Sequence, residues 1–196
     1  MSQQPRPTLR QRVAAAILDA AAEVLAAQGG QASMSDVAAA AGVARATLYR
    51  YFPSRDALLD ELARVAAREA GEGLAAAGLD RVPPADSVTR AVRVLVGVGD
   101  YFVLLDRARG RAGPAEYERK VAAPLRAVIE RGQAAAELRD DVPAVWLAEA
   151  LVGLVVSVLR AAPRLAVEDR VAAIGGVFLD GVRTRNSARI VSAPPG

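Results

Sequence analysis

The chain has 196 residues, of which 53% are hydrophobic, so it can bury a substantial core in one domain or in a small and a larger one. It contains no cysteine and no histidine, which excludes disulfides, zinc sites of the usual Cys/His kind and catalysis by histidine or thiolate. The net charge of +3 arises entirely in residues 1–55, where six arginines outweigh three acidic residues. A basic N-terminal quarter followed by a neutral remainder indicates a region that contacts nucleic acid.

The composition also predicts the fold class. We expect an all-α protein, because alanine, the best helix former, is the most frequent residue and strand-favouring aromatic residues make up only 4%. The N-terminus lacks the apolar run of a secretory signal, which makes the cytoplasm the expected location. The segment Val142–Leu159 is apolar enough to be considered for a membrane span, but Pro143 and Glu149 lie within it. Because an ionised carboxylate is costly in a bilayer, a helix buried in a bundle is favoured, and no membrane is expected as a partner.

Apolar residues recur at steps of three and four along most of the chain, and Gly and Pro separate the periodic segments. This pattern predicts about nine helices, because Pro124 divides one of the segments into two pieces. Residues 1–7 are expected to form a flexible arm, and the residues after Asn186 a frayed tail. In chain order, the predicted helical segments are 9–28, 35–41, 44–51, 55–77, 85–109, 114–137, 143–161 and 167–184.

The second and third predicted helices are short and are joined by a tight turn at Gly42, within the segment SDVAAAAGVARATLYRYFPSRDALL of residues 35–59. Ser35 is the expected cap of the first of the two, and small alanines allow them to cross closely. Four apolar residues are spaced to form a small core with the preceding helix: Val37, Val43, Leu48 and Phe52. Because this core pins the third helix by one side, its other side is expected to be exposed and to carry Arg45, Ala46, Thr47, Tyr49 and Arg50.

An exposed face of this composition, near the N-terminus of the second helix of such a pair, is typical of a helix that enters the major groove of DNA. Arginine can bind guanine O6 and N7 or a phosphate, and threonine and tyrosine hydroxyls can donate hydrogen bonds to phosphate oxygens. Arg55, at the start of the next helix, adds positive charge where backbone N–H groups also attract phosphate. Short alanine-rich helix pairs occur in many proteins, however, and an Arg/Tyr face is equally compatible with ordinary solvated surface.

Over residues 9–60 the chain resembles the tetracycline-repressor (TetR) family of transcriptional regulators. The positions that carry the resemblance are Ile17, Ala20, Ala21, Gly29, Ser35, Val37, Ala38, Ala41, Gly42, Val43, Thr47, Leu48, Tyr49, Tyr51, Phe52, Pro53, Arg55, Leu58 and Leu59. The resemblance implies a helix-turn-helix DNA-binding domain over residues 1–54, a helical ligand-binding and dimerisation domain over 55–186, and a flexible tail over 187–196. The implied DNA-binding residues are Ser35, Arg45, Ala46, Thr47, Tyr49, Arg50 and Arg55, joined by an arm that carries Arg6 and Arg10.

The same resemblance implies a homodimer, in which the last two helices of each subunit pack against those of the partner as a four-helix bundle. Small residues in these helices fit such packing, because a mid-helix glycine costs about 1 kcal/mol relative to alanine and is expected where something must come close. Drift toward small residues in an alanine- and glycine-rich proteome would give the same composition. The expected interface residues are Ala150, Gly153, Ser157, Gly176 and Phe178.

The resemblance also implies a pocket for a small-molecule effector of unknown identity in the larger domain, with no cofactor and no metal. Binding there would move the fourth helix and spread the two DNA-reading heads. The candidate pocket residues are polar-tipped or aromatic residues on otherwise apolar helices: Asp100, Tyr101, Phe102, Tyr117, Gln133 and Trp146. Each of them also suits ordinary packing, and Asp100 suits an exposed stripe with Arg93 and Arg107.

The predicted function is a sequence-specific transcriptional regulator, a repressor that a small molecule releases from a palindromic operator in double-stranded DNA. The alternative is a ligand- or partner-binding helical dimer that has lost specific DNA binding. Ala44 keeps this alternative open, because the family usually has Ser or Thr there, and alanine removes a helix cap and a phosphate contact. An enzyme is not expected, because the sequence has no nucleophile motif, phosphate loop or carboxylate pair at metal-ligand spacing. A non-specific architectural DNA protein would need a more basic chain.

Overall fold

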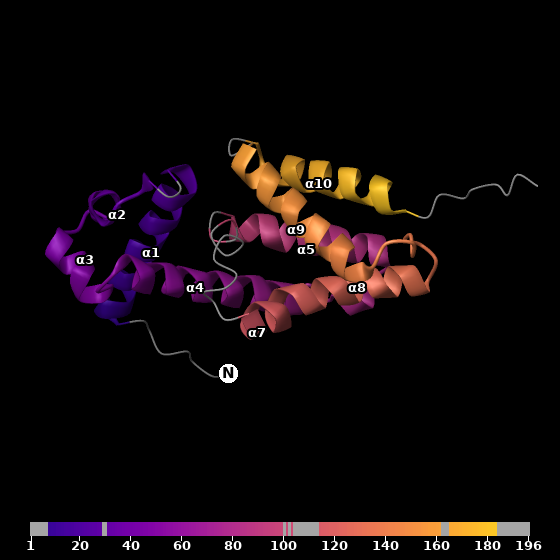
Figure 1. The fold of residues 1–196 in the computed structure, drawn as a ribbon, viewed down its shortest axis with the longest axis horizontal. Helices are drawn as coiled ribbons and strands as arrows, with labels where there is room; N and C mark the ends of the chain where they lie inside the picture. Colours follow the sequence, from indigo (N-terminus) through magenta and orange to yellow (C-terminus); the bar gives the residue numbers. More distant parts are fainter. Residues whose placement is uncertain are drawn as a thin grey trace, which may run out of the picture.

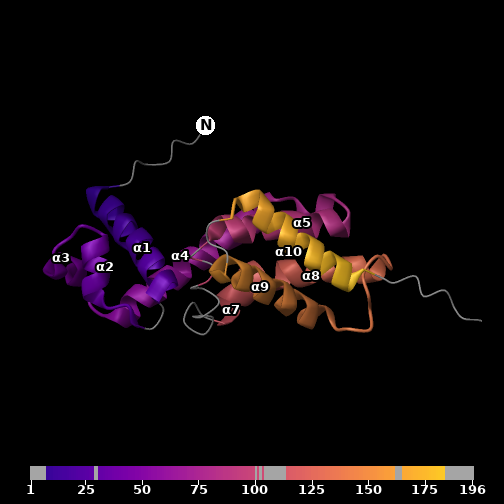
Figure 2. The same cartoon turned by 90° about the horizontal axis from the view of Figure 1, so that it is seen from above.

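The structure is a computed structural model that describes residues 8–28, 31–99, 101, 103, 114–161 and 165–183. Its regular secondary structure is helical throughout these residues, which confirms the predicted all-α class. An N-terminal lobe holds α1 (Leu9–Gln28), α2 (Met34–Ala40) and α3 (Arg45–Tyr51). Helix α4 (Arg55–Ala76) runs from this lobe into a larger helical bundle, so the molecule is elongated along α4 (Figure 1, Figure 2).

The helical bundle follows the predicted segments, with two differences. Its elements are the 3-10 turn η2 (Leu79–Arg81), α5 (Pro84–Val98), α7 (Pro114–Tyr117), the π-helical turn η3 (Glu118–Ala122), α8 (Ala123–Ala134), α9 (Ala144–Ala161) and α10 (Val167–Val182). Helix α5 ends well before the predicted residue 109, because Gly99 takes a backbone φ of +59° that ends the helix. The path from α7 to α8 is continuous, and the widened turn η3 lies directly before Pro124, whose ring would clash with a regular helix.

Helix α2 is capped by Ser33 and begins at Met34, which corrects the expectation that Ser35 is the cap. The Ser33 Oγ accepts a hydrogen bond from the Asp36 N–H at 3.2 Å, and the Asp36 carboxylate accepts one from the Ser33 N–H at 2.9 Å. This reciprocal capping box lowers the pKa of Asp36 below its ordinary value. Ser35 is therefore an exposed residue of the first turn, whose side chain is not used to start the helix.

The turn between α2 and α3 depends on Gly42. Its φ of +65° lies in the left-handed region, and its N–H donates to the Ala39 carbonyl at 3.1 Å. The N–H of Val43 donates to the Ala38 carbonyl at 3.0 Å. This pair of bonds is a Schellman motif, which ends α2 and reverses the chain toward α3 at a position that only glycine adopts without strain.

The N-terminal lobe has its own hydrophobic core, and α3 is pinned in it as predicted. Leu48 is fully buried, Val37 and Phe52 are buried, and Val43 is partly buried against them. Ile17 from α1 is also fully buried in this cluster. A helix of seven residues is too short to be stable alone, so this packing holds α3 in place.

Helix α4 contributes to both cores. Leu58 and Leu62, in its first half, are buried in the core of the N-terminal lobe, whereas Ala70 and Leu74, in its second half, are buried in the core of the bundle. The predicted domain boundary between residues 54 and 55 thus falls at the start of a helix that the two cores share. The division into domains stays a prediction.

Arg131 and Ser87 fasten the turn between α4 and α5 to α8. The Arg131 Nη2 donates to the Leu79 carbonyl and to the Ser87 Oγ, each at 2.7 Å. The fully buried Ser87 hydroxyl in turn donates to the Leu79 carbonyl at 2.6 Å. These bonds satisfy the buried Ser87 hydroxyl and the Leu79 carbonyl, and so fix the turn η2 that follows α4.

Helix α9 is long and apolar enough to cross a membrane by length and composition alone. In the structure it packs against α8 and α10, and Leu151, Val152 and Val155 are almost fully buried in the bundle core. Glu149 lies on its exposed side. This arrangement matches the predicted core helix of a bundle.

The first prediction concerns Gly132, where another side chain packs closely against the helix. A Cβ at this position would lie 2.5 Å from Leu138 Cδ1 and 2.6 Å from Leu138 Cγ, with Pro84 Cβ at 3.2 Å on another side. Leu138 is buried and cannot move away freely. We expect Gly132→Ala to lower the free energy of unfolding by about 1–3 kcal/mol, measured by urea denaturation.

Gly97→Ala is the matched control, because it is also a helical glycine and no atom of the described residues lies within 4 Å of its added Cβ. Alanine is the better helix former, so this variant should be neutral or more stable by about 0.5–1 kcal/mol. Equal effects of the two substitutions would contradict the packing described for Gly132.

Candidate nucleic-acid interface

Helix α3 presents the face that the sequence predicts. Arg45, Ala46, Tyr49 and Arg50 are exposed, and Thr47 is half-buried, while Leu48 between them has no exposed surface. Tyr49 exposes 37% of its surface although it is a large aromatic residue. The hydroxyl, the two guanidinium groups and the small Ala46 therefore face solvent together, on a helix whose opposite side is fixed in the core.

Three of the exposed arginines lie against tyrosine rings. The guanidinium carbon of Arg45 lies 5.6 Å from the centroid of the Tyr49 ring. Arg10 of α1 and Arg50 of α3 both lie 5.8 Å from the centroid of Tyr51. Cation–π attraction limits the freedom of these side chains, so their charges are held near the surface of the lobe before any ligand arrives. Arg10 lies in α1, within the helix predicted over residues 9–28, and Arg6 lies outside the described residues.

The two remaining predicted DNA-binding residues flank α3 on neighbouring elements. Ser35 is exposed in the first turn of α2, and Arg55 is exposed as the first residue of α4. Helix α4 is capped by Ser54, whose Oγ accepts a hydrogen bond from the Ala57 N–H at 3.1 Å. Helix α3, in contrast, begins at Arg45, and Ala44 before it provides no side-chain cap, as its sequence predicts.

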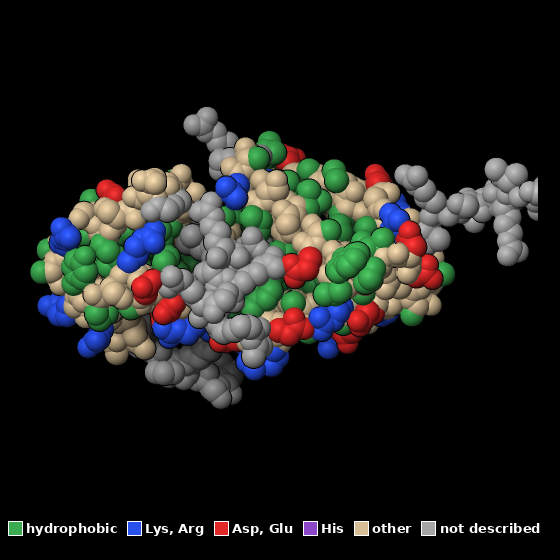
Figure 3. All heavy atoms as spheres, viewed as in Figure 1, with side chains coloured by type: hydrophobic (Ala, Val, Ile, Leu, Met, Phe, Trp, Pro, Cys, Tyr) green, Lys and Arg blue, Asp and Glu red, His purple; other side chains and the backbone are tan. Residues whose placement is uncertain are grey.

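The outer end of this lobe carries several arginines, alongside the exposed acidic residues Asp36 and Asp56. In the space-filling view, Lys and Arg side chains lie around the part of the lobe that is farthest from the bundle (Figure 3). The described basic residues there come from α1, α3 and the start of α4, and the acidic residues Asp19 and Glu23 of α1 lie in the helix's second half. Positive charge and hydrogen-bond donors therefore coincide on one end of the molecule, as a phosphate backbone requires.

The structure does not bring the predicted pocket residues together. Trp146 is 67% exposed on α9, whereas Tyr117 is buried in the bundle core. The Gln133 amide donates to the carbonyls of Arg139 at 2.9 Å and Val142 at 2.8 Å, so it closes the loop between α8 and α9. Asp100 and Phe102 lie outside the described residues.

Tyr101 has a different role from the predicted one, because its hydroxyl reaches the N-terminal lobe. It donates a hydrogen bond of 2.6 Å to Oδ1 of Asp19 on α1, and its ring packs against both hydrophobic cores. Burial raises the pKa of Tyr101 well above its ordinary value, helped by this hydrogen bond and by the carboxylates of Glu69 and Glu23. The hydroxyl therefore stays protonated and donates across the junction between the lobe and the bundle.

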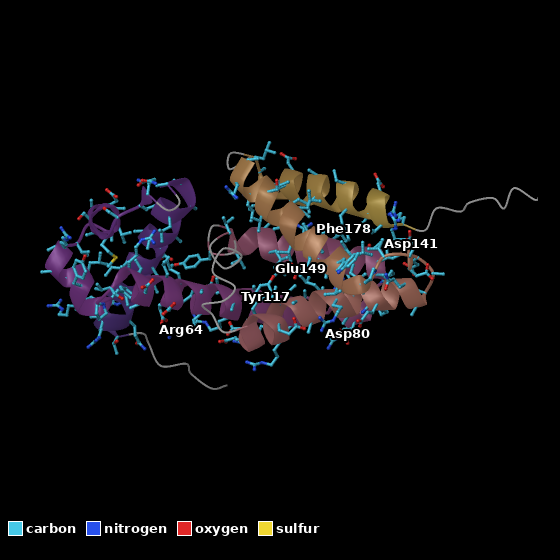
Figure 4. All side chains as sticks on the ribbon, viewed as in Figure 1. Arg64, Asp80, Tyr117, Asp141, Glu149 and Phe178 are labelled. Atoms are coloured by element: carbon cyan, nitrogen blue, oxygen red, sulfur yellow. The ribbon has the colours of Figure 1, made fainter. Side chains whose placement is uncertain are left out.

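The predicted interface residues fall into two groups. Ala150, Gly153, Ser157 and Gly176 are exposed on α9 and α10, where a partner can reach them. Phe178 is only 5% exposed and belongs to the core of its own subunit, which corrects its assignment to the interface (Figure 4). The adjacent Val177 lies on the exposed side of α10 and is 65% exposed.

Sequence reasoning missed the contacts that join distant segments. The stacking of Arg10 on Tyr51 joins α1 to α3, and the Tyr101–Asp19 hydrogen bond joins the bundle to α1 across 82 positions. No local pattern signals such pairs. The helical phase does signal the Phe178 error, because Ile174 and Phe178 are four residues apart and share one buried face, whereas Val177 follows Ala173 on the exposed one.

Comparison with known proteins agrees with this geometry. The model of the bacterial regulatory proteins of the tetR family matches residues 17–62. Over 55 residues the chain is 54% identical to the HTH-type transcriptional repressor LfrR of Mycolicibacterium smegmatis, a match that covers 28% of this chain and 29% of the repressor. In sequence, the chain therefore matches less than a third of that relative's length.

Solved structures extend the similarity to the whole fold. The TetR-like regulator LfrR from Mycobacterium smegmatis, in complex with proflavine, matches with a TM-score of 0.72 and 28% identity, over 89% of this chain and 98% of that one. AibR, in complex with isovaleryl coenzyme A and operator DNA, has the same fold with a TM-score of 0.67 and 19% identity, over 84% and 97% of the two chains. By its sequence over residues 17–62, and by a fold shared with LfrR over 89% of its length, the chain is similar to the TetR family of bacterial regulatory proteins.

Proposed function

We propose that the protein is a cytoplasmic, homodimeric transcriptional repressor that binds a palindromic operator and is released by a small molecule. The observation that carries the proposal is the exposed α3 face, on which Arg45, Tyr49 and Arg50 project from a helix that Leu48 fixes in the core. A preorganised basic helix of this kind fits the major groove. The relatives support the same role, since LfrR is a repressor and AibR binds operator DNA. On this proposal the chain is not an enzyme.

The exposed faces of α9 and α10 support a homodimer. Small residues line them, and no atom lies within 4 Å of a Cβ added at Gly153, Gly176 or Gly181. Nothing in the described part of the subunit therefore requires glycine at these helical positions, where alanine would be more stable. Large apolar side chains flank them, because Trp146 and Val177 are each about two-thirds exposed. A second copy of this face would cover the apolar residues and use the space above the glycines.

Release by a small molecule needs a connection between the bundle and the DNA-binding lobe. Helix α4 provides it, because its two halves are buried in different cores. The Tyr101–Asp19 hydrogen bond is a second connection at the same junction. An effector that binds better to one orientation of the lobe shifts the population toward it, which changes the spacing of the two α3 helices in the dimer.

Selection of duplexes from a random pool, at near-physiological salt, tests the proposed function. We expect enrichment of a palindrome with half-sites about one helical turn apart or slightly more. Salt-sensitive retention of DNA without any enriched sequence would contradict it. That result would favour the ligand- or partner-binding dimer that has lost specific DNA binding, which the uncapped start of α3 at Ala44 is compatible with.

Two substitutions in α3 separate backbone contact from base contact on the selected duplex. Tyr49→Phe removes only a hydroxyl and should weaken binding to all sequences to a similar extent, as loss of a phosphate contact would. Arg50→Ala should relax the preference at one base pair, with a discrimination loss of about 1–3 kcal/mol, measured by titration against single-base variants. Wild-type affinity and selectivity in both variants would show that the α3 face does not enter the groove.

The Tyr101–Asp19 bond can be measured by a double-mutant cycle on the free energy of unfolding. Because the acceptor is charged and the donor half-buried, Tyr101→Phe and Asp19→Asn should show a coupling of about 1 kcal/mol. Glu23→Gln is the control, since its carboxylate is nearby without accepting this bond, and its coupling to Tyr101→Phe should be near zero. Equal coupling energies for Asp19 and Glu23 would show that the Tyr101–Asp19 hydrogen bond does not connect the two regions specifically.

A further inference from the structure

A second site in the bundle is lined by none of the residues that the sequence singled out. It is a pocket of about 420 Å³ between the last turns of α4, the turn η2, and η3 with the start of α8. Asp80, on its wall, marks its position at the end of α4 that is farthest from the N-terminal lobe (Figure 4). The volume lies in the range of pockets that hold small organic ligands.

The walls of this pocket are apolar at the bottom and cationic at the rim. Leu74, Leu79 and Val128 are buried core residues that form its base. Its remaining charged lining consists of Arg119, Lys120 and Arg131, against the single carboxylate of Asp80. The positive charge of Lys120 is partly compensated, because its Nζ lies 3.0 Å from Oε1 of Glu116. The lining thus combines apolar surface with an excess of positive charge.

The positive charge of Arg131 is held in one position by hydrogen bonds. Its Nη2 donates to the carbonyls of Leu79 and Val82 and to the Ser87 hydroxyl, so the three partners of this nitrogen are neutral. These bonds hold the guanidinium in place without cancelling its charge. A preorganised, half-buried cation beside buried leucines selects an anion that carries an apolar body, because either part alone would leave the other uncompensated.

We propose that this pocket binds a small organic carboxylate with an apolar body, and that the bound carboxylate is an effector of the DNA binding proposed above. The second half of the statement rests on the proposed function, and the first half does not. The carboxylate lies against Arg131 and the Arg119 rim, and the apolar body covers Leu74, Leu79 and Val128.

The position of the pocket connects it to α4. Helix α4 is tightly packed on both sides next to the pocket: a Cβ at Gly71 would lie 2.9 Å from Lys120 Cβ, and one at Gly73 would lie 2.6 Å from Val94 Cγ1. Gly71 and Lys120 are themselves pocket residues. A ligand that displaces η3 at this close contact would shift α4, and α4 would carry the shift to the lobe core through Leu62.

Calorimetric titration of the full chain without DNA tests the site directly. Octanoate and 2-naphthoate are the probes, with 1-octanol, 2-naphthol and octylammonium as matched neutral and cationic compounds. We expect at least one carboxylate to bind at least tenfold more tightly than its neutral counterpart and than octylammonium. The proposal is overturned if neither carboxylate binds, or if the compounds bind equally.

Matched variants locate the binding. Ala75→Phe fills the pocket from α4, whereas the neighbouring exposed Ala76→Phe lies outside the lining. Arg119→Gln removes a rim charge, and Arg12→Gln makes the same change on α1. We expect tenfold or greater loss of carboxylate binding in Ala75→Phe and several-fold loss in Arg119→Gln, with wild-type affinity in both controls. Unchanged binding in Ala75→Phe, with its fold intact by circular dichroism, places the carboxylate elsewhere and refutes the site.

The effector role is measured separately, as the change in affinity for the selected duplex at saturating carboxylate. We expect at least a fivefold change in the wild type and none in Ala75→Phe. Binding without this change would refute the effector role and leave the site standing. Failure of the chain to select any duplex would refute the proposed function, while the calorimetric result would still decide the site.

Discussion

Helix α4 is one continuous helix whose side chains are buried in two hydrophobic cores. Leu58 and Leu62 are 1% exposed in the lobe core, and Ala67 and Ala70 have no exposed surface in the bundle core. Interiors packed at this density do not deform continuously, so a displacement of one end of α4 is carried to the other. The orientation of α3, the position of the Tyr101–Asp19 bond and the influence of any ligand in the bundle all depend on this shared helix.

Much of the fold could be predicted from the sequence because its signals are local. The periodicity of apolar residues, Gly42 and the break at Pro53 are properties of short segments, and α1 spans the predicted residues. Errors arose where two local signals competed. Ser33 and Ser35 both precede an apolar stretch, and only the reciprocal bonds with Asp36 decide for Ser33. The predicted helix to residue 109 overlooked the left-handed backbone at Gly99.

The DNA-facing side of α3 was accessible to sequence reasoning for the same local reason. Once Leu48 is assigned to the core, the helical period places Arg45, Tyr49 and Arg50 on other sides. The pocket could not be predicted from the sequence, because polar side chains on apolar helices can serve several different roles. Gln133 closes a loop, and Tyr101 bonds to the lobe. The pocket beside α4 is lined by two groups of residues that lie 39 to 60 positions apart along the chain, and the packing of α4 and η2 on η3 and α8 brings them together.

Unfolding followed by two separate probes tests the shared role of α4 most directly. The single Trp146 reports on the bundle, and a dye on Ala40→Cys reports on the lobe, since the chain has no cysteine of its own. At one fixed protein concentration, the account predicts coincident urea transitions for the two probes. It also predicts that Leu62→Ala, which should cost about 2–5 kcal/mol, shifts both transitions together. A shift of the lobe transition alone, with the Trp146 transition unchanged, would contradict the account.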